Sequence, residues 1–222
     1  MKYFTKENDG IVMNLLIISA SQRTESQSAK VAEYLANSST QFNKVRHIEL
    51  CKQRLPLWDG EESSKTNDNN DWLAINSQLQ TMDALILITP EWGGTASPLL
   101  KNLLMMSDAA DSGHKPVLLV SVVNGISGAY PIAELRMNAF SNNKLVAIPD
   151  HLIIRNVEEI LNTADEANLQ QASAITARDK RIRHRIGYSL HTLLHYGQAM
   201  KSLRETLQVS TYDNEHLYQY GM

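Results

Sequence analysis

The stretch NLLIISASQRTESQS, residues 14–28, decides how the chain begins to fold. Its first part, 14–19, is apolar, too short for a helix, and typical of a parallel strand that is covered on both faces. A loop of small and hydroxyl-bearing residues follows, and apolar residues at helical spacing begin after Ser26. A strand, a polar loop and a helix in this order predict the first unit of an α/β sheet.

The same alternation continues along the chain. Strands are expected at 14–19, 44–50, 84–89, 116–123 and 145–154, the last interrupted by Pro149. Helices are expected at 26–36, 71–82, 97–106, 129–140 and roughly 164–208, and 55–71 reads as a surface loop. Five such units predict a doubly wound parallel sheet with helices on both faces. Ligands of such sheets lie beyond the carboxyl ends of the strands.

Composition narrows the class of protein. The 222 residues are 43% hydrophobic and 20% charged, as in an ordinary single globular domain. The net charge of -3 provides no basic field for nucleic acid or an anionic membrane, and no apolar run reaches the roughly 18–20 residues of a membrane span. The single cysteine, Cys51, excludes an internal disulfide and a multi-cysteine metal site, and it fits a cytoplasmic location.

One domain is expected over most of the chain. Residues 1–12 read as a leader, because charges stand where a signal peptide has its apolar segment. Residues 13–176 are expected to form the sheet domain, and 177–222 a C-terminal helical extension of the same domain.

The loop after the first strand has the chemistry of a phosphate site. Phosphates bind where backbone N–H groups, hydroxyls and a helix N-terminus meet, and Arg23 adds a cation. The loop contains neither GxGxxG nor GxxxxGK[ST], so it is neither of those two phosphate-binding motifs. An ordinary polar loop with a serine cap is the alternative, and this loop alone does not separate the two. The hydroxyl donors are Ser19, Ser21, Thr24, Ser26 and Ser28.

A second loop, TPEWGGTASPLLKN at 89–102, follows the most apolar strand. Gly93 and Gly94 allow the backbone to pass close to a ligand, and Trp92 offers a flat ring. The alternatives are a solvated charge for Glu91 and a lid over the core for Trp92.

A third loop, SVVNGISGAYP at 121–131, also connects a strand to a helix. Its glycines, Gly125 and Gly128, suit a backbone that lies against a flat ligand, and a turn that requires glycine is the alternative.

The first two loops resemble those of the NAD(P)H-dependent FMN reductase family, which includes azoreductases and quinone and chromate reductases; the third loop matches this family least. Its members carry G-S-x-R-x-x-S-x-N after the first strand, where this chain reads ASQRTESQS at 20–28. They carry LPLYD, here LPLWD at 55–59, and TPEYNGSIPGVLKN, here TPEWGGTASPLLKN at 89–102. The resemblance covers about residues 14–150, and the last of these stretches is its most specific part. The chain departs from the pattern at Ala20, Ser28, Trp92 and Gly93.

The resemblance implies a flavodoxin-like fold with strand order 2-1-3-4-5 and FMN as the cofactor. The first loop would hold the phosphate, the second would run along the isoalloxazine ring, and the third would approach its other side. The cofactor-binding candidates are Ser19, Ser21, Arg23, Ser26, Gln27, Ser28, Pro90, Glu91, Trp92, Gly93, Gly94, Ser121, Asn124 and Gly125.

The implied activity is transfer of hydride from NAD(P)H to the flavin and on to a small acceptor such as free FMN, a quinone or an azo compound. Two alternatives remain: a non-catalytic flavodoxin-type electron carrier, and a member of the fold that binds no flavin. The family tends to dimerise, so a homodimer or homotetramer is expected. No catalytic side chain and no metal-ligand set are predicted, since the flavin carries the chemistry.

A basic cluster begins the last predicted helix, and its members are Arg178, Lys180, Arg181, Arg183 and Arg185. A solvated helix face explains it most simply. Attraction of the 2′-phosphate of NADPH from a neighbouring subunit is the other interpretation.

Overall fold

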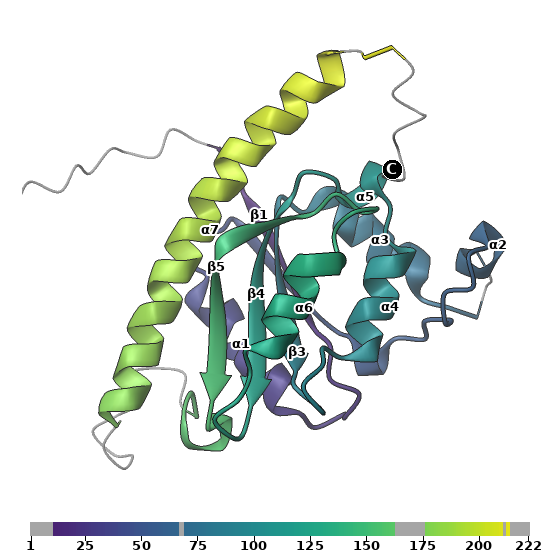
Figure 1. The fold of residues 1–222 in the computed structure, drawn as a ribbon. Helices are drawn as coiled ribbons and strands as arrows, with labels where there is room; N and C mark the ends of the chain where they lie inside the picture. Colours follow the sequence, from purple (N-terminus) through teal and green to yellow (C-terminus); the bar gives the residue numbers. More distant parts are fainter. Residues whose placement is uncertain (1–10, 67–68, 163–175, 211, 214–222) are drawn as a thin grey trace, which may run out of the picture.

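The five predicted strands form one parallel sheet (Figure 1). The computed structural model describes residues 11–66, 69–162, 176–210 and 212–213. The strands are β1 (Asn14–Ser19), β2 (Lys44–Glu49), β3 (Ala84–Pro90), β4 (Pro116–Val123) and β5 (Val146–Arg155). Their order is β2-β1-β3-β4-β5, and every neighbouring pair is parallel. The expected flavodoxin-like sheet is therefore confirmed, and its strand order reverses between β1 and β3.

Helices cover both faces of this sheet. One face carries α1 (Gln27–Ser38) and α7 (Ala177–Val209), and the other carries α3 (Trp72–Thr81), α4 (Pro98–Met106) and α6 (Tyr130–Asn138) (Figure 1). Successive strand residues point to opposite faces, so Leu15 and Ile17 pack in one apolar core while Leu16 and Ile18 pack in the other. The two cores hold the strands rigid, so their carboxyl ends form a fixed platform for loops.

A short helix replaces part of the loop expected at 55–71. Within that loop the helix is α2 (Glu62–Lys65). Elsewhere the short elements are α5 (Ala109–Ser112), which follows α4, and the 3-10 turns η1 (Leu50–Lys52) and η2 (Val157–Glu159). Lys65 explains why α2 forms. Its ammonium is buried, lies 2.8 Å from carboxylates of both Glu62 and Asp108, and stands over the rings of Trp58 and Trp72. A tertiary anchor therefore orders a segment whose composition alone reads as loop.

The edge strand β5 contains the irregularity expected at Pro149. Val117 pairs with Ala147 and Leu119 with His151, so the register of β5 against β4 shifts at the proline. The Arg136 guanidinium of α6 donates hydrogen bonds to the carbonyl oxygens of Ile148 and Asp150. The two carbonyl oxygens that flank Pro149 at the bulge therefore have hydrogen-bond donors.

Helix α7 begins later than the expected helix at 164–208. Residues 163–175 lie outside the described residues, as do 1–10 of the expected leader and 214–222 of the expected extension. Ile186, Leu190 and Leu194 of α7 are buried against the sheet. Beyond them, α7 continues past the edge of the sheet (Figure 1). Of the helices that the structure describes, none combines the length and apolarity needed to cross a bilayer.

Lys115, which directly precedes β4, gives the fold a measurable pH dependence. Its buried ammonium donates hydrogen bonds to the last carbonyls of α3, at Leu79 and Gln80. Burial lowers the pKa of Lys115 from 10.5 to about 8, Arg204 acts in the same direction, and Asp83 and an aspartate of α5 oppose. Between these two pKa values the unfolded chain binds one proton more than the folded chain, so stability rises with pH there.

Replacing Lys115 with methionine tests whether its pKa is lowered in the folded protein. From pH 7.5 to 10.5, the unfolding free energy of the parent should rise relative to Lys115→Met by on the order of 3 kcal/mol. Urea denaturation of both proteins at several pH values measures the difference, in which other titrating groups cancel. A difference that stays constant over this range would contradict the lowered pKa of Lys115.

Candidate functional site

A cavity of about 390 Å³ opens beyond the carboxyl ends of β1, β3 and β4, beside the point where the strand order reverses. We call it the strand-end slot. Four segments wall it: 21–28, 90–92, 122–125 and 157–158. This is the place where an open α/β sheet leaves a crevice between loops that diverge to opposite faces.

Ten of the fourteen predicted binding residues line the strand-end slot. They are Ser21, Arg23, Ser26, Gln27, Ser28, Pro90, Glu91, Trp92, Asn124 and Gly125. The other four lie near it without lining it: Ser19, Gly93, Gly94 and Ser121. Residues far apart in the sequence thus meet at one cavity, as the parallel sheet requires.

The first wall is the start of α1. Ser26 has extended backbone and caps the helix, its hydroxyl accepting from the Ala29 N–H at 3.1 Å. The Ser21 hydroxyl accepts from the Arg23 N–H at 3.2 Å, which closes the loop. Ser28 follows in the first turn and is buried, and no acidic residue stands there. The wall therefore presents hydroxyls and the positive end of a helix dipole, a combination suited to an anion.

Arg23 stacks on the second wall. Its guanidinium carbon lies 5.3 Å from the centre of the Trp92 ring, and Trp92 is 40% exposed. This stacking links the first loop to the second across the mouth of the slot, and sequence reasoning gave no sign of it. Trp92 is therefore a rim residue here, and the alternative of a buried core lid is wrong.

Glu91 joins the second wall to the third. One carboxylate oxygen, Oε2, accepts from the Ser127 hydroxyl and from the Gly128 N–H at 2.7 Å. The other, Oε1, is buried and has no partner among the described residues. Glu91 is thus an organising acceptor, and the alternative of a merely solvated charge is wrong. Its second oxygen therefore remains open to a donor outside the described residues.

Glycine is required at two of the turns. Gly93 and Gly94, with φ of 58° and 76°, form the tight turn by which Trp92 and Thr95 pair with each other. Gly128 has φ of 101°, and a Cβ there would lie 2.5 Å from Ile153 Cγ2. Gly93 and Gly94 therefore shape the loop, and Gly128 allows the third loop to lie flat on β5.

Two predicted residues lie behind the slot. The Ser19 hydroxyl is 2.9 Å from His47 Nε2, and burial lowers the pKa of that histidine while Glu49 opposes. Ser121 is fully buried in β4, and its hydroxyl has no partner among the described residues. Ser19 therefore links β1 to β2, whereas Ser121 makes no such link among the described residues.

Sequence reasoning missed five lining residues: Glu25, Val122, Val123, Val157 and Glu158. Glu25 belongs to the loop predicted after the first strand, and Val122 and Val123 are the last residues of β4. Val157 and Glu158 follow β5, and the parallel direction of the predicted strands could have indicated them. In a parallel sheet the segment after the last strand emerges at the same edge as the others.

The described residues contain no cluster of three His, Cys, Asp or Glu side chains able to hold a metal ion. His191 and His195 of α7 lie edge to face, with ring centres 4.5 Å apart. They contact each other on the helix surface.

Removing the Glu91 carboxylate should release the third loop. In Glu91→Ala the Gly128 N–H loses its acceptor, so its hydrogen exchange should quicken roughly tenfold or more, because a bond to a charged group is lost. In the matched Glu91→Gln variant the amide oxygen still accepts, and exchange should change less. Mass-spectrometric hydrogen exchange measures both. Equal protection of the 124–129 segment in both variants and the parent would contradict this role.

Comparison with known proteins adds independent findings. The family model described as NADPH-dependent FMN reductase matches residues 13–159. An NADPH azoreductase of Bacillus sp. (strain OY1-2) is 28% identical over 142 residues, covering 64% of this chain and 76% of that protein. An FMN-dependent NADPH-azoreductase of Staphylococcus saprophyticus subsp. saprophyticus is 26% identical over 128 residues, covering 56% and 68%.

Solved structures share the fold. The flavoenzyme NAD(P)H:(acceptor) oxidoreductase FerB of Paracoccus denitrificans superposes with a TM-score of 0.62 at 15% identity, covering 85% of this chain and 99% of that chain. The apo form of the NADH:FMN oxidoreductase EMOB gives a TM-score of 0.57 at 16% identity, covering 85% and 90%. At these identities the likeness supports the fold alone.

Proposed function

Because the chain belongs to the NADPH-dependent FMN reductase family, we propose that it binds FMN in the strand-end slot and passes hydride from NAD(P)H to a small electron acceptor. The observation that carries this proposal is the slot itself. One cavity joins a hydroxyl-lined helix N-terminus to the Pro90–Trp92 corner. A mononucleotide flavin needs both, an anchor for its phosphate and a flat, polar-edged place for its ring.

The residues present fit that group. Gln27 and Glu91 both line the slot, and each has a buried side-chain oxygen without a partner among the described residues. Buried acceptors of this kind are normally paired, so they favour a ligand that brings N–H and O–H donors. Nothing lies within 4 Å of a Cβ built on Gly125, which leaves open space at the third wall.

The roles of the side chains follow from this arrangement. Ser21, Ser26 and Ser28, with the first amides of α1, would bind the phosphate, and Arg23 would move from Trp92 toward it. Glu91 would hold the third loop with one oxygen and accept from the ligand with the other. Trp92 would cover the ring and exclude water at the mouth of the slot.

FMN, when bound, would supply the ring that takes a hydride from the nicotinamide and gives it to the acceptor. No side chain has to act as a nucleophile in this reaction, and we assign that role to none. The chain's own contribution is to bind, orient and exclude water.

The acceptor is the finer part of the proposal. The two relatives described above are named azoreductases, so an azo compound is the first candidate, before quinones and free FMN. A homodimer or homotetramer also belongs to the proposal. Its support is the exposed apolar side chains of Ile126 and Tyr130 in the third loop and at the start of α6. The cytoplasmic location rests on the single cysteine.

Two measurements test the function. Titration of the purified protein with FMN, followed by the change in flavin fluorescence, should saturate at one FMN per chain. The loaded protein should then oxidise NADPH or NADH with an azo dye, a quinone or free FMN as acceptor. No uptake of FMN would refute the proposal. Uptake without oxidation of either nicotinamide would favour a flavodoxin-type electron carrier.

A further inference from the structure

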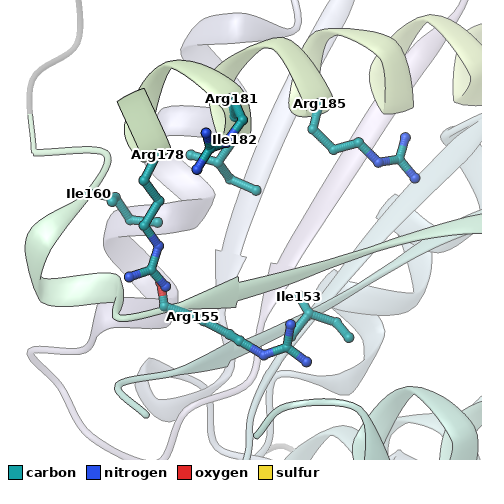
Figure 2. A pocket seen from close by; sticks show the side chains of 7 residues that line it. All are labelled: Ile153, Arg155, Ile160, Arg178, Arg181, Ile182 and Arg185. Atoms are coloured by element: carbon teal, nitrogen blue, oxygen red, sulfur yellow. The ribbon is translucent and has the colours of Figure 1, made fainter. Parts of the chain in front are cut away.

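A second cavity, also about 390 Å³, lies between the end of β5 and the first turns of α7 (Figure 2). We call it the arginine pocket. Four arginines and three isoleucines line it: Arg155, Arg178, Arg181, Arg185, Ile153, Ile160 and Ile182. In Figure 2, Arg178, Arg181, Ile182 and Arg185 project from α7, while Ile153 and Arg155 of β5 lie on the side of the strand away from the helix, and Ile160 follows η2.

The charges in the arginine pocket do not cancel. Arg185 forms a two-point ion pair with Asp150. Arg178 lies 3.9 Å from an exposed Glu159 carboxylate and donates mainly to neighbouring carbonyl and amide oxygens. Arg155 and Arg181 have no ion pair with a carboxylate in the part of the chain that the structure describes. Among the described residues, four guanidinium groups therefore line the pocket, against two carboxylates that pair with them, and the surplus favours a ligand with more than one negative charge.

The other lining residues indicate what the uncharged part of that ligand is. Ile153, Ile160 and Ile182 give an apolar surface between the guanidinium groups. Arginine also stacks on planar rings, because its guanidinium is flat and weakly hydrated. A flat heterocycle that carries phosphates, as a purine nucleotide does, matches both properties.

The arginine pocket borders the strand-end slot. Residues 155–160 run between the two cavities: Val157 and Glu158 line the slot, while Arg155 and Ile160 line the pocket. Arg155 Nε donates to the Ser127 carbonyl at 2.6 Å, and the Ser127 hydroxyl donates to Glu91. The two cavities are therefore neighbours, separated by one short segment.

We propose that the arginine pocket binds the phosphorylated adenosine end of the nicotinamide donor, with Arg181 on the phosphate that distinguishes NADPH from NADH. This inference rests on the proposed function, since the donor is the substrate of the neighbouring slot. It assigns α7 a role in choosing the donor.

Binding of adenosine 2′,5′-bisphosphate, measured by titration calorimetry, tests the pocket without any turnover. Arg181→Gln should weaken binding about tenfold, the loss of one charge-assisted contact of about 1.4 kcal/mol. The matched control is Lys180→Gln, which removes the same charge from the adjacent exposed position outside the pocket and should leave binding unchanged. Adenosine 5′-phosphate and inorganic phosphate should both bind more weakly than the bisphosphate.

In the FMN-loaded protein, Arg181→Gln should raise the KM for NADPH about tenfold, again by one charge-assisted contact. The KM for NADH and the affinity for FMN should not change.

Equal bisphosphate affinities in the two variants would overturn the inference, as would inorganic phosphate binding as tightly as the nucleotide. The two proposals fail separately. Normal FMN uptake and turnover without bisphosphate binding would refute only the role proposed for the arginine pocket. Bisphosphate binding without FMN uptake would refute only the proposal that FMN binds in the strand-end slot.

Discussion

Replacing Ser28 with aspartate should lower the affinity for FMN by roughly a hundredfold or more, because like charges brought together at a binding interface cost several kcal/mol. Ser28 is 2% exposed, lies in the first turn of α1 and lines the strand-end slot. The new carboxylate would stand where we place the phosphate. An aspartate in the first turn gains from the helix dipole, but its charge loses hydration at this buried position, so the flavin-free variant should also be less stable than the parent.

The matched variant is Ser28→Asn, which also enlarges the side chain but adds no charge. Its FMN affinity should stay within about threefold of the parent, because an amide keeps the capacity to donate and accept hydrogen bonds. Fluorescence titration with FMN measures both variants, and thermal unfolding of the flavin-free proteins shows whether either fold has changed. Tight FMN binding by the aspartate variant would place the phosphate elsewhere.

Asp179→Ala should destabilise the protein by about 3–5 kcal/mol, because it removes one partner of a buried ion pair. Asp179 and Arg183 are 6% and 7% exposed and lie 3.2 Å apart on successive turns of α7. Asp179 also accepts from the Leu161 N–H, and the Arg183 guanidinium stands over the Tyr34 ring of α1. In a chain of this size, that loss corresponds to a Tm lower by about 10 °C.

The double variant Asp179→Ala, Arg183→Met separates the cost of the unpaired charge from the loss of the pair. Removing both charges should restore much of the stability, because an apolar side chain of similar length fills the space without desolvated charge. Urea denaturation of the two variants and the parent measures the effect. A double variant that is no more stable than Asp179→Ala would show that the cost lies in the lost backbone contact to Leu161.

The fold could be predicted from the sequence because its signals are local. β1 and β4 have the expected bounds, since each is a continuous apolar run between polar residues. Helix α4 begins where a capping serine, Ser97, precedes a proline. Helices α2 and α5 have four residues each, too few to show a helical period, and the buried Lys65 anchor of α2 is a tertiary contact.

Some walls of the strand-end slot could likewise be predicted from local sequence, and others could not. Residues 21–28 and 90–92 form consecutive motifs, so the sequence identified them together. Val157 and Glu158 have no motif and reach the slot only because β5 ends at the same edge. The stacking of Arg23 on Trp92 joins residues 69 positions apart, and no pattern along the chain indicates it.

The basic cluster at the start of α7 shows what helical periodicity can and cannot predict. Helical spacing predicts which arginines of α7 share a face, and a solvated face was the simpler interpretation. Arg183 is buried beside Asp179, and Arg155 of β5 also lines the pocket. Neither fact follows from the sequence of α7, because both depend on which strand the helix crosses.

The bulge at Pro149 bears on how the protein behaves at high concentration. An outermost strand normally offers a row of free N–H and C=O groups to which another chain can add a strand, the first step toward aggregates. Here proline removes a donor, the register shift bends the strand, and Arg136 occupies two of its carbonyls. This border of the sheet is therefore poorly matched to an incoming strand, which protects the folded molecule from edge-to-edge self-association.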